Sequence, residues 1–282
     1  MNDAPPERTF RYLADLLERH SGQELSPTRY WRVETVLKPV MRAHALADLP
    51  ALVWALSAGS NRVLERQTIE AMLNNETSFF RDQASFALLT GPALTALREA
   101  RSATRRLRIW SAACSTGQEA YSLAMTLSDD RANWQGWTIE IVGSDISHSV
   151  VERAREGRYS QFEIQRGMPI ALMLRYFARD GDDWVARDNL RSMVIFRQQN
   201  LLEPLRMASD FDIVLCRNMI MYLQQEHRPA VFDQLARSMR GDGLLMLGAA
   251  ETVIGQTDRF RASRDYRGLY ECATMRSERS AA

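Results

Sequence analysis

The segment at residues 109–125 constrains this chain more than any other, because an apolar run there gives way to small residues and then to a helical pattern. The run reads as a buried strand, and the apolar residues from Ala120 to Leu127 recur at helical spacing. A strand, a tight turn and a helix N-terminus together form a backbone cradle that can hold a ligand. The alternative is ordinary packing of a strand and a helix around a glycine turn.

Two residues make the ligand interpretation more specific. Gly117 permits backbone angles that other residues resist, and small neighbours let ligand atoms come close to the main chain. Glu119 is the single acid in the first turn of the predicted helix, where it suits a ligand that carries positive charge.

Composition excludes several classes of protein. At 282 residues the chain is long enough for two modest domains or one large one, and its formal net charge of +1 gives no global field for nucleic acid or a membrane surface. We find no apolar run that could span a bilayer and no signal peptide, so we expect a cytoplasmic protein. Cys114, Cys216 and Cys272 are odd in number and widely spaced, which argues against a disulfide framework and a metal site.

The periodicity divides the chain into regions. Residues 1–74 show helical spacing and predict a small all-helical domain, and residues 75–90 read as an interdomain loop and helix. Within residues 91–282, strands are expected at 107–112, 138–144, 193–196, 211–216 and 244–247, and helices at 118–128, 149–156 and 225–240. This alternation predicts an α/β fold with a doubly wound, mostly parallel sheet.

Residues 158–198 interrupt the alternation and predict a small β-rich insertion. We expect strands at 159–162, 184–187 and 193–196, a helix at 170–177 and a turn at 180–183. Near the end of the chain, residues 260–261 and 266–271 predict a terminal antiparallel pair.

Several polar residues follow predicted strands, where ligands bind in open α/β sheets. Asp145 ends the second strand and could accept hydrogen bonds from both hydroxyls of a ribose, or could instead cap the next helix. Asn200 follows the third strand. Arg217, Asn218 and Tyr222 follow the fourth and are candidates to line the same crevice, although Tyr222 could simply pack on the next helix.

Residues 75–82 form a polar loop around two adjacent phenylalanines. From the residues alone, this loop is either a linker anchored by its aromatic side chains, with Asp82 capping the next helix, or part of a site.

Four blocks taken together resemble the CheR family, the chemotaxis receptor glutamate methyltransferases. They occur in the family's order and are NETSFFR at 75–81, WSAACSTGQEAY at 110–121, GSDI at 143–146 and FDIVLCRNMIMY at 211–222. The helical N-terminal region and the insertion also fit this family. One departure is Gln118, where the family often has an acid.

The resemblance implies a class I, Rossmann-like methyltransferase domain that uses S-adenosylmethionine to form methyl esters on receptor glutamates, leaving S-adenosylhomocysteine. It implies an active-site pair, Arg81 and Tyr222. The cofactor contacts that it implies are Asn75, Thr77, Arg81, Glu119, Asp145, Asn200, Leu201, Arg217 and Asn218.

The resemblance also implies a partner, the cytoplasmic helices of chemoreceptors, recognised by the helical domain. Candidate contacts, which could equally be a solvated charged face, are Arg29, Arg32, Lys38 and Arg42. We expect a monomer, and the short turn at 180–183 favours an enzyme that does not use a receptor tether. Two other functions stay open: a cofactor-binding signalling module with little turnover, and a small-molecule O-methyltransferase.

Overall fold

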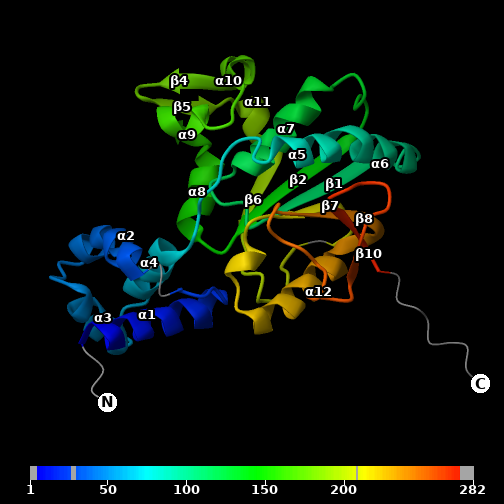
Figure 1. The fold of residues 1–282 in the computed structure, drawn as a ribbon. Helices are drawn as coiled ribbons and strands as arrows, with labels where there is room; N and C mark the ends of the chain where they lie inside the picture. Colours follow the sequence, from blue (N-terminus) through cyan, green and yellow to red (C-terminus); the bar gives the residue numbers. More distant parts are fainter. Residues whose placement is uncertain (1–4, 27–29, 208, 274–282) are drawn as a thin grey trace, which may run out of the picture. The chain divides into compact units, whose positions relative to one another are not determined.

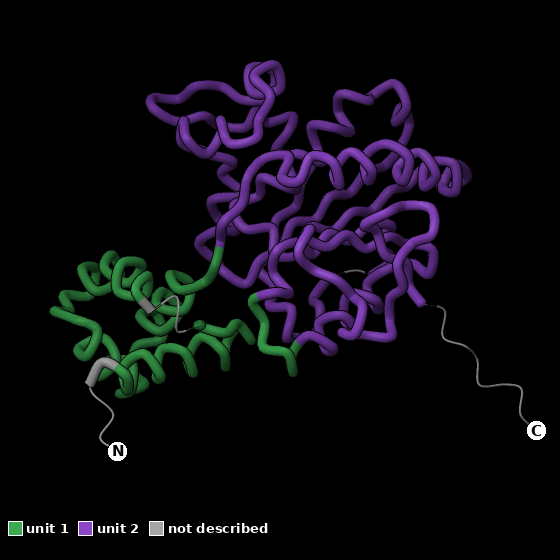
Figure 2. Tube along the Cα trace, viewed as in Figure 1, with its two compact units in different colours: residues 1–74, 222–227 green, residues 75–221, 228–282 purple. Residues whose placement is uncertain are grey.

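The computed structural model describes residues 5–26, 30–207 and 209–273, and it has the predicted α/β fold (Figure 1). The chain divides into two compact units, one of residues 1–74 with 222–227 and one of residues 75–221 with 228–282 (Figure 2). In the described part of the chain, every helix is too short or too polar to cross a bilayer.

The smaller unit contains four α-helices that bury the apolar faces expected from their spacing. They are α1 (Pro5–Ser21), α2 (Tyr30–Ala43), α3 (Leu49–Ser57) and α4 (Arg62–Met72). Leu13, Leu17 and Leu37 are fully buried between them. Asp48 and Asn61 accept hydrogen bonds from backbone N–H groups at the starts of α3 and α4, so these two side chains set where the helices begin.

The larger unit is built on a seven-stranded sheet with the order β6-β2-β1-β7-β8-β10-β9. Its first five strands in this order are parallel, and β10 and β9 add an antiparallel edge, as predicted. The strands are β1 (Arg106–Ala112), β2 (Thr138–Asp145), β6 (Val194–Gln198), β7 (Phe211–Cys216), β8 (Met239–Leu247), β9 (Phe260–Ala262) and β10 (Leu269–Cys272). Every residue of β7 is buried, as expected for a central strand that is covered on both faces.

Helices flank this sheet (Figure 1). They are α5 (Gln83–Leu88), the π-helical η2 (Leu89–Ala93), α6 (Leu94–Ala100), α7 (Gln118–Asp129), α8 (His148–Glu156) and α12 (Arg228–Ser238). Two short 3-10 turns, η3 (Ile220–Tyr222) and η4 (Gln225–His227), follow β7 in the chain, and η4 belongs to the smaller unit. The structure differs from the sequence prediction in α12, which begins three residues later than expected. Pro229 is the reason, because proline fits the first turn of a helix but would break a hydrogen bond further inside it.

The insertion is present and is folded around a second sheet with the order β3-β5-β4. Its elements are β3 (Arg158–Ser160), α9 (Gln161–Gln165), α10 (Ile170–Tyr176), β4 (Phe177–Asp180), β5 (Asp183–Ala186) and α11 (Asp188–Arg191). The predicted strand at 159–162 ends early, because Ser160 forms a reciprocal capping box with Glu163 and starts α9. The predicted strand at 193–196 corresponds to β6, which pairs with β2 of the large sheet and not with the insertion.

The core of the large sheet contains one very close approach. A Cβ atom added to Gly143 of β2 would lie 2.6 Å from the ring of Phe196 on β6. That ring is confined on its other sides, because Gly117 would meet it at 2.9 Å and Tyr121 lies against it with 5.4 Å between ring centroids. The ring therefore has little room to move away from an added methyl group.

We expect Gly143→Ala to lower the free energy of unfolding by about 1–3 kcal/mol, the usual cost of overpacking a core. The measurement is urea denaturation followed by circular dichroism. Gly241→Ala is the matched control, because Gly241 also lies in a strand of this sheet and its added Cβ would meet no atom within 4 Å. Equal unfolding midpoints for the two variants would contradict the packing described here.

Candidate active site

The carboxyl ends of β1, β2 and β7 form the topological switch point of the large sheet. From β1 the chain passes to β2 on one side, and later returns to β7 on the other side of β1. Ligands of open α/β sheets bind in the crevice at such a point. Four of the nine predicted cofactor contacts, Glu119, Asp145, Arg217 and Asn218, lie at or just after the ends of these strands.

The loop after β1, residues 113–117, is a cradle of small residues with an unusual backbone. Ala113, Ser115 and Gly117 have φ values of 56°, 51° and 92°. Both the positive φ and the lack of space favour glycine at position 117. An added Cβ there would lie 3.0 Å or less from Phe196 and Ala154. Small side chains at these positions allow a ligand to come close to the main chain.

Asp145 holds this cradle from the end of β2. Its two carboxylate oxygens accept hydrogen bonds from the backbone N–H groups of Ser115, at 2.9 Å, and Ser147, at 3.0 Å. The helix cap of α8 is Ser147 and not Asp145, so the capping alternative for Asp145 is wrong. Burial, and then the charges of Asp145 and Glu119, raise the pKa of the Cys114 thiol, which therefore stays neutral in the cradle.

Arg217 and Glu119, both predicted cofactor contacts, pair with each other. Nη1 of Arg217 lies 2.9 Å from Oε2 of Glu119, and Oε1 of Glu119 accepts a hydrogen bond from the Ser111 hydroxyl at 2.8 Å. Nη2 of Arg217 donates to the carbonyl of Arg81 at 2.9 Å and to Oδ2 of Asp82 at 2.7 Å. The side chain of Arg217 is only 3% exposed, so this network is buried at its centre.

The segment at residues 75–82, at the start of the larger unit, is bonded to other parts of that unit at several points. The carbonyl of Asn75 accepts a 2.6 Å hydrogen bond from the Ser115 hydroxyl, and the N–H of Phe80 donates to the Ser122 hydroxyl at 3.0 Å. Arg81 is half-buried, and its Nη1 donates to the carbonyl of Glu76 at 3.0 Å. These contacts place Arg81 beside the cradle, which a plain linker would not do.

Asp82 does not have the capping role considered from the sequence. Its φ is +55°, and its side chain makes no cap hydrogen bond to α5. The carboxylate is directed to Arg217 instead. Nothing in the local sequence could have shown this, because the two residues are 135 positions apart.

The remaining predicted contacts lie in the loops after β6 and β7. Oδ1 of Asn200 accepts a hydrogen bond from the N–H of Leu202, and Leu201 is buried. Asn218 has a φ of 58°, and its N–H donates to the carboxylate of Glu251 at 2.7 Å. Sequence reasoning missed Glu251, which shapes this turn from 33 residues further along the chain. Thr77 is partly exposed in the segment before Arg81.

Two buried polar atoms indicate where a ligand would bind. Among the described residues, Nε of Arg217 and Oδ1 of Asn218 are the buried side-chain nitrogen and oxygen atoms without a hydrogen-bond partner. Leaving such an atom unsatisfied costs about 1–3 kcal/mol. The two atoms come from consecutive residues at the end of β7, and they offer one donor and one acceptor to a polar ligand in the crevice.

Tyr222 is positioned by the helical unit. Its carbonyl accepts a hydrogen bond from the N–H of Glu24 at 2.8 Å, and its neighbour Leu223 forms a β-bridge with Gln23. The main chain around Tyr222 is thus held by residues 23–24 of the smaller unit, whereas the main chain of Arg81 is held by Arg217 of the larger unit.

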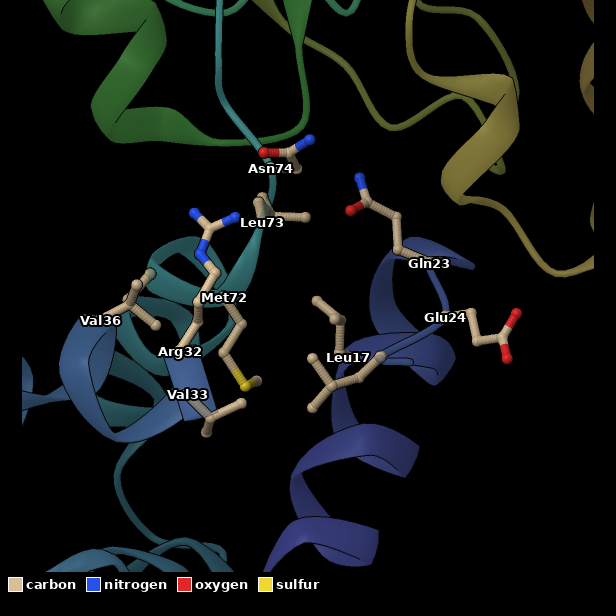
Figure 3. Close-up of a pocket in the computed structure, with 11 residues that line it drawn as sticks. Leu17, Gln23, Glu24, Arg32, Val33, Val36, Met72, Leu73 and Asn74 are labelled. Carbon is tan, nitrogen blue, oxygen red and sulfur yellow. The ribbon is translucent and has the colours of Figure 1, made fainter. Parts of the chain in front are cut away.

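Three of the predicted basic residues, Arg32, Lys38 and Arg42, lie on α2. Arg32 reaches over a pocket in the helical unit that has apolar walls from Leu17, Val33 and Met72 (Figure 3). Lys38 and Arg42 line a separate hollow towards the start of α3. Arg29 lies outside the described residues. Because residues 32 and 38 are six positions apart on a helix of 3.6 residues per turn, their side chains leave it in different directions.

Comparison with known proteins agrees with this geometry. Residues 75–268 match the family described as "CheR methyltransferase, SAM binding domain". The chain is 34% identical over 266 residues to a chemotaxis protein methyltransferase of Vibrio parahaemolyticus, covering 93% of this chain and 96% of that protein. It is 32% identical over 256 residues to chemotaxis protein methyltransferase 1 of Pseudomonas aeruginosa, covering 89% of this chain and 93% of that protein.

The matched region begins at Asn75 and contains the cradle, Asp145, Arg217 and the segment that carries Arg81. The positive-φ cradle and the unsatisfied pair at the end of β7 fit a ligand with hydroxyl, amino and carboxylate groups, and S-adenosylmethionine has all three. From the match and the similarity over nearly its whole length, the chain belongs to the CheR methyltransferase family, and its cofactor is S-adenosylmethionine.

Proposed function

We propose that this chain methylates glutamate side-chain carboxylates on the cytoplasmic part of chemoreceptors and forms methyl esters there. The observation that carries the proposal is the attachment of the Arg81 segment to the cofactor cradle through Arg217 and Glu119. The main chain of Arg81 is bonded to Arg217, and its guanidinium, which donates to the Glu76 carbonyl in the same segment, has the chemistry to bind an anionic methyl acceptor. The names of the relatives, chemotaxis protein methyltransferases, support the same assignment.

In the proposed reaction, the main task of the protein is to align the acceptor oxygen with the methyl group of the cofactor. When bound, S-adenosylmethionine supplies a methyl group on a positively charged sulfur. A glutamate carboxylate is already ionised at neutral pH, so the chain needs no general base to activate it. The task of the residues is to hold the acceptor oxygen in line with the methyl group and to exclude water.

Arg81 has the proposed role of holding one oxygen of the substrate carboxylate by a charge-assisted hydrogen bond. The other oxygen remains available as the nucleophile. Tyr222 has the proposed role of orienting the substrate or the methyl donor through its hydroxyl group. A tyrosine acting as a base would be superfluous for a carboxylate acceptor.

Cofactor binding is assigned to the loops around the switch point. The carboxylate of Asp145, which accepts hydrogen bonds from the N–H groups of Ser115 and Ser147, has the proposed role of accepting hydrogen bonds from the ribose hydroxyls. Glu119 offers negative charge to the cationic cofactor, and Arg217 and Asn218 offer the two unsatisfied atoms. Asn75, Thr77, Arg81, Asn200 and Leu201 complete the proposed set.

The first experiment is methyl transfer from labelled S-adenosylmethionine to a receptor cytoplasmic fragment. We expect incorporation of label that alkali releases as methanol, because a methyl ester is base-labile and an N-methyl group is not. Cofactor binding without incorporation would favour a signalling module with little turnover. Transfer to small carboxylic acids but not to the receptor fragment would favour a small-molecule methyltransferase.

We expect Arg81→Ala to lower kcat/KM for the receptor fragment about tenfold to hundredfold, the worth of one hydrogen bond between charged groups. The rate is measured at saturating cofactor, and calorimetry checks that S-adenosylhomocysteine still binds. Arg166→Ala is the control, because Arg166 pairs with Glu76 of the same loop through an exposed ion pair that contributes little. An unchanged rate in Arg81→Ala with intact cofactor binding would remove its proposed role.

We expect charge reversal at both Lys38 and Arg42 to weaken turnover on the receptor fragment several-fold and to leave cofactor affinity unchanged. Both residues line one hollow together with Glu34 and Asp48, so reversing the two positive charges would leave only acidic side chains there to repel an acidic partner. A separate Arg32→Glu variant tests whether the other side of α2 also contributes to turnover on the receptor fragment. If the double variant methylates receptors at the wild-type rate at low ionic strength, this surface is not the docking site.

A further inference from the structure

Tyr159 is a fully buried residue of the insertion that the proposed function leaves without a role. It lies on β3, in the small sheet, and its hydroxyl donates a 2.7 Å hydrogen bond to the carbonyl of Thr116. Thr116 belongs to the cradle loop, between Ser115 and Gly117. The phenol thus satisfies a main-chain acceptor in the loop that the cofactor approaches.

The ring of Tyr159 contacts the segment that carries Arg81. Its centroid lies 5.0 Å from that of Phe79, in an edge-to-face arrangement, and Phe177 of β4 lies 5.7 Å from the same phenylalanine. Phe79 is fully buried and stands two residues before Arg81. The insertion therefore supplies the aromatic surroundings that hold this segment in place.

Gly167, in the turn between α9 and α10, holds the backbone of the same segment. Its φ is +85°, and an added Cβ would lie only 2.1 Å from the carbonyl oxygen of Phe79. Because the clashing atom belongs to the backbone, rotation of a side chain could not relieve the clash. The main chain near Arg81 therefore packs closely against the insertion at Phe79, and it is hydrogen-bonded to Arg217 at Arg81.

We propose that Tyr159 is a positioning residue that holds the cofactor cradle and the Arg81 segment in register with each other. The hydroxyl acts on the cradle through Thr116, and the ring acts on Arg81 through Phe79. The inference rests on the proposed function, and it extends that function to the insertion. Burial raises the pKa of Tyr159 well above its usual value, so its hydroxyl stays a donor across the working pH range.

The test compares Tyr159→Phe with Tyr121→Phe. Tyr121 is equally buried and its hydroxyl donates to a main-chain carbonyl at a similar distance, 2.8 Å, but that carbonyl belongs to Ala154 in α8 and not to the cradle. Both changes keep the ring and remove one hydrogen bond. Any general cost in stability should therefore be similar in the two variants.

We expect Tyr159→Phe to raise the Kd for S-adenosylhomocysteine, measured by calorimetry, about three- to tenfold, and to lower kcat on the receptor fragment. Tyr121→Phe should stay within about twofold of the wild type in both quantities at a comparable loss of Tm. Equal Kd and kcat values for the two variants would overturn the inference. Binding of S-adenosylhomocysteine can be read even if no receptor fragment is methylated, so failure of the proposed function is distinguishable.

A second pair of variants tests whether the insertion holds the segment that carries Arg81. Gly167→Ala and Gly181→Ala both place a side chain at positive φ within the insertion, but the added Cβ of Gly181 would meet nothing within 4 Å. We expect only Gly167→Ala to lower kcat on the receptor fragment and to weaken cofactor binding. If the two alanine variants match each other in both measurements, the insertion does not position Arg81.

Discussion

The buried guanidinium of Arg217 is the interaction on which the rest of the site depends. A charge that is 3% exposed must be neutralised and hydrogen-bonded, or its burial would cost several kcal/mol. Its partners are Glu119 from the start of α7, and Asp82 and the Arg81 carbonyl from the loop before α5. One side chain at the end of β7 thereby joins the cradle to the loop that carries Arg81.

The other end of β7 is held by a similar arrangement. Asp212, fully buried near the start of the strand, accepts a hydrogen bond from Nε of Arg101 at 2.7 Å and from the N–H of Arg108 at 2.8 Å. Arg101 also binds Asp242, and this hydrogen bond lowers the pKa of the Asp242 carboxyl. The central strand is thus fixed by buried charge at both ends, which limits how far Arg217 can move relative to β1.

The insertion contributes to the site through shape and main-chain contacts. Tyr159 donates a hydrogen bond to the Thr116 carbonyl, and Gly167 lies where an added Cβ would meet the Phe79 carbonyl. Neither residue carries charge, and neither would be noticed by a search for catalytic side chains. These contacts connect the small antiparallel sheet to the cradle loop and to the segment before Arg81.

The sequence by itself determined the α/β class, the strands of the large sheet and the location of the cradle, because hydrophobic periodicity and glycine turns are local signals. It also indicated Asp145, Glu119, Arg217 and Arg81 as site residues through a family resemblance. Only the tertiary structure decided that Arg217 pairs with Glu119 and Asp82, 98 and 135 residues away. It alone showed that the Asp82 side chain caps no helix, and that the Tyr159 hydroxyl donates to the Thr116 carbonyl. Such pairings depend on which buried groups must satisfy each other once the sheet is assembled, and no local pattern records that requirement.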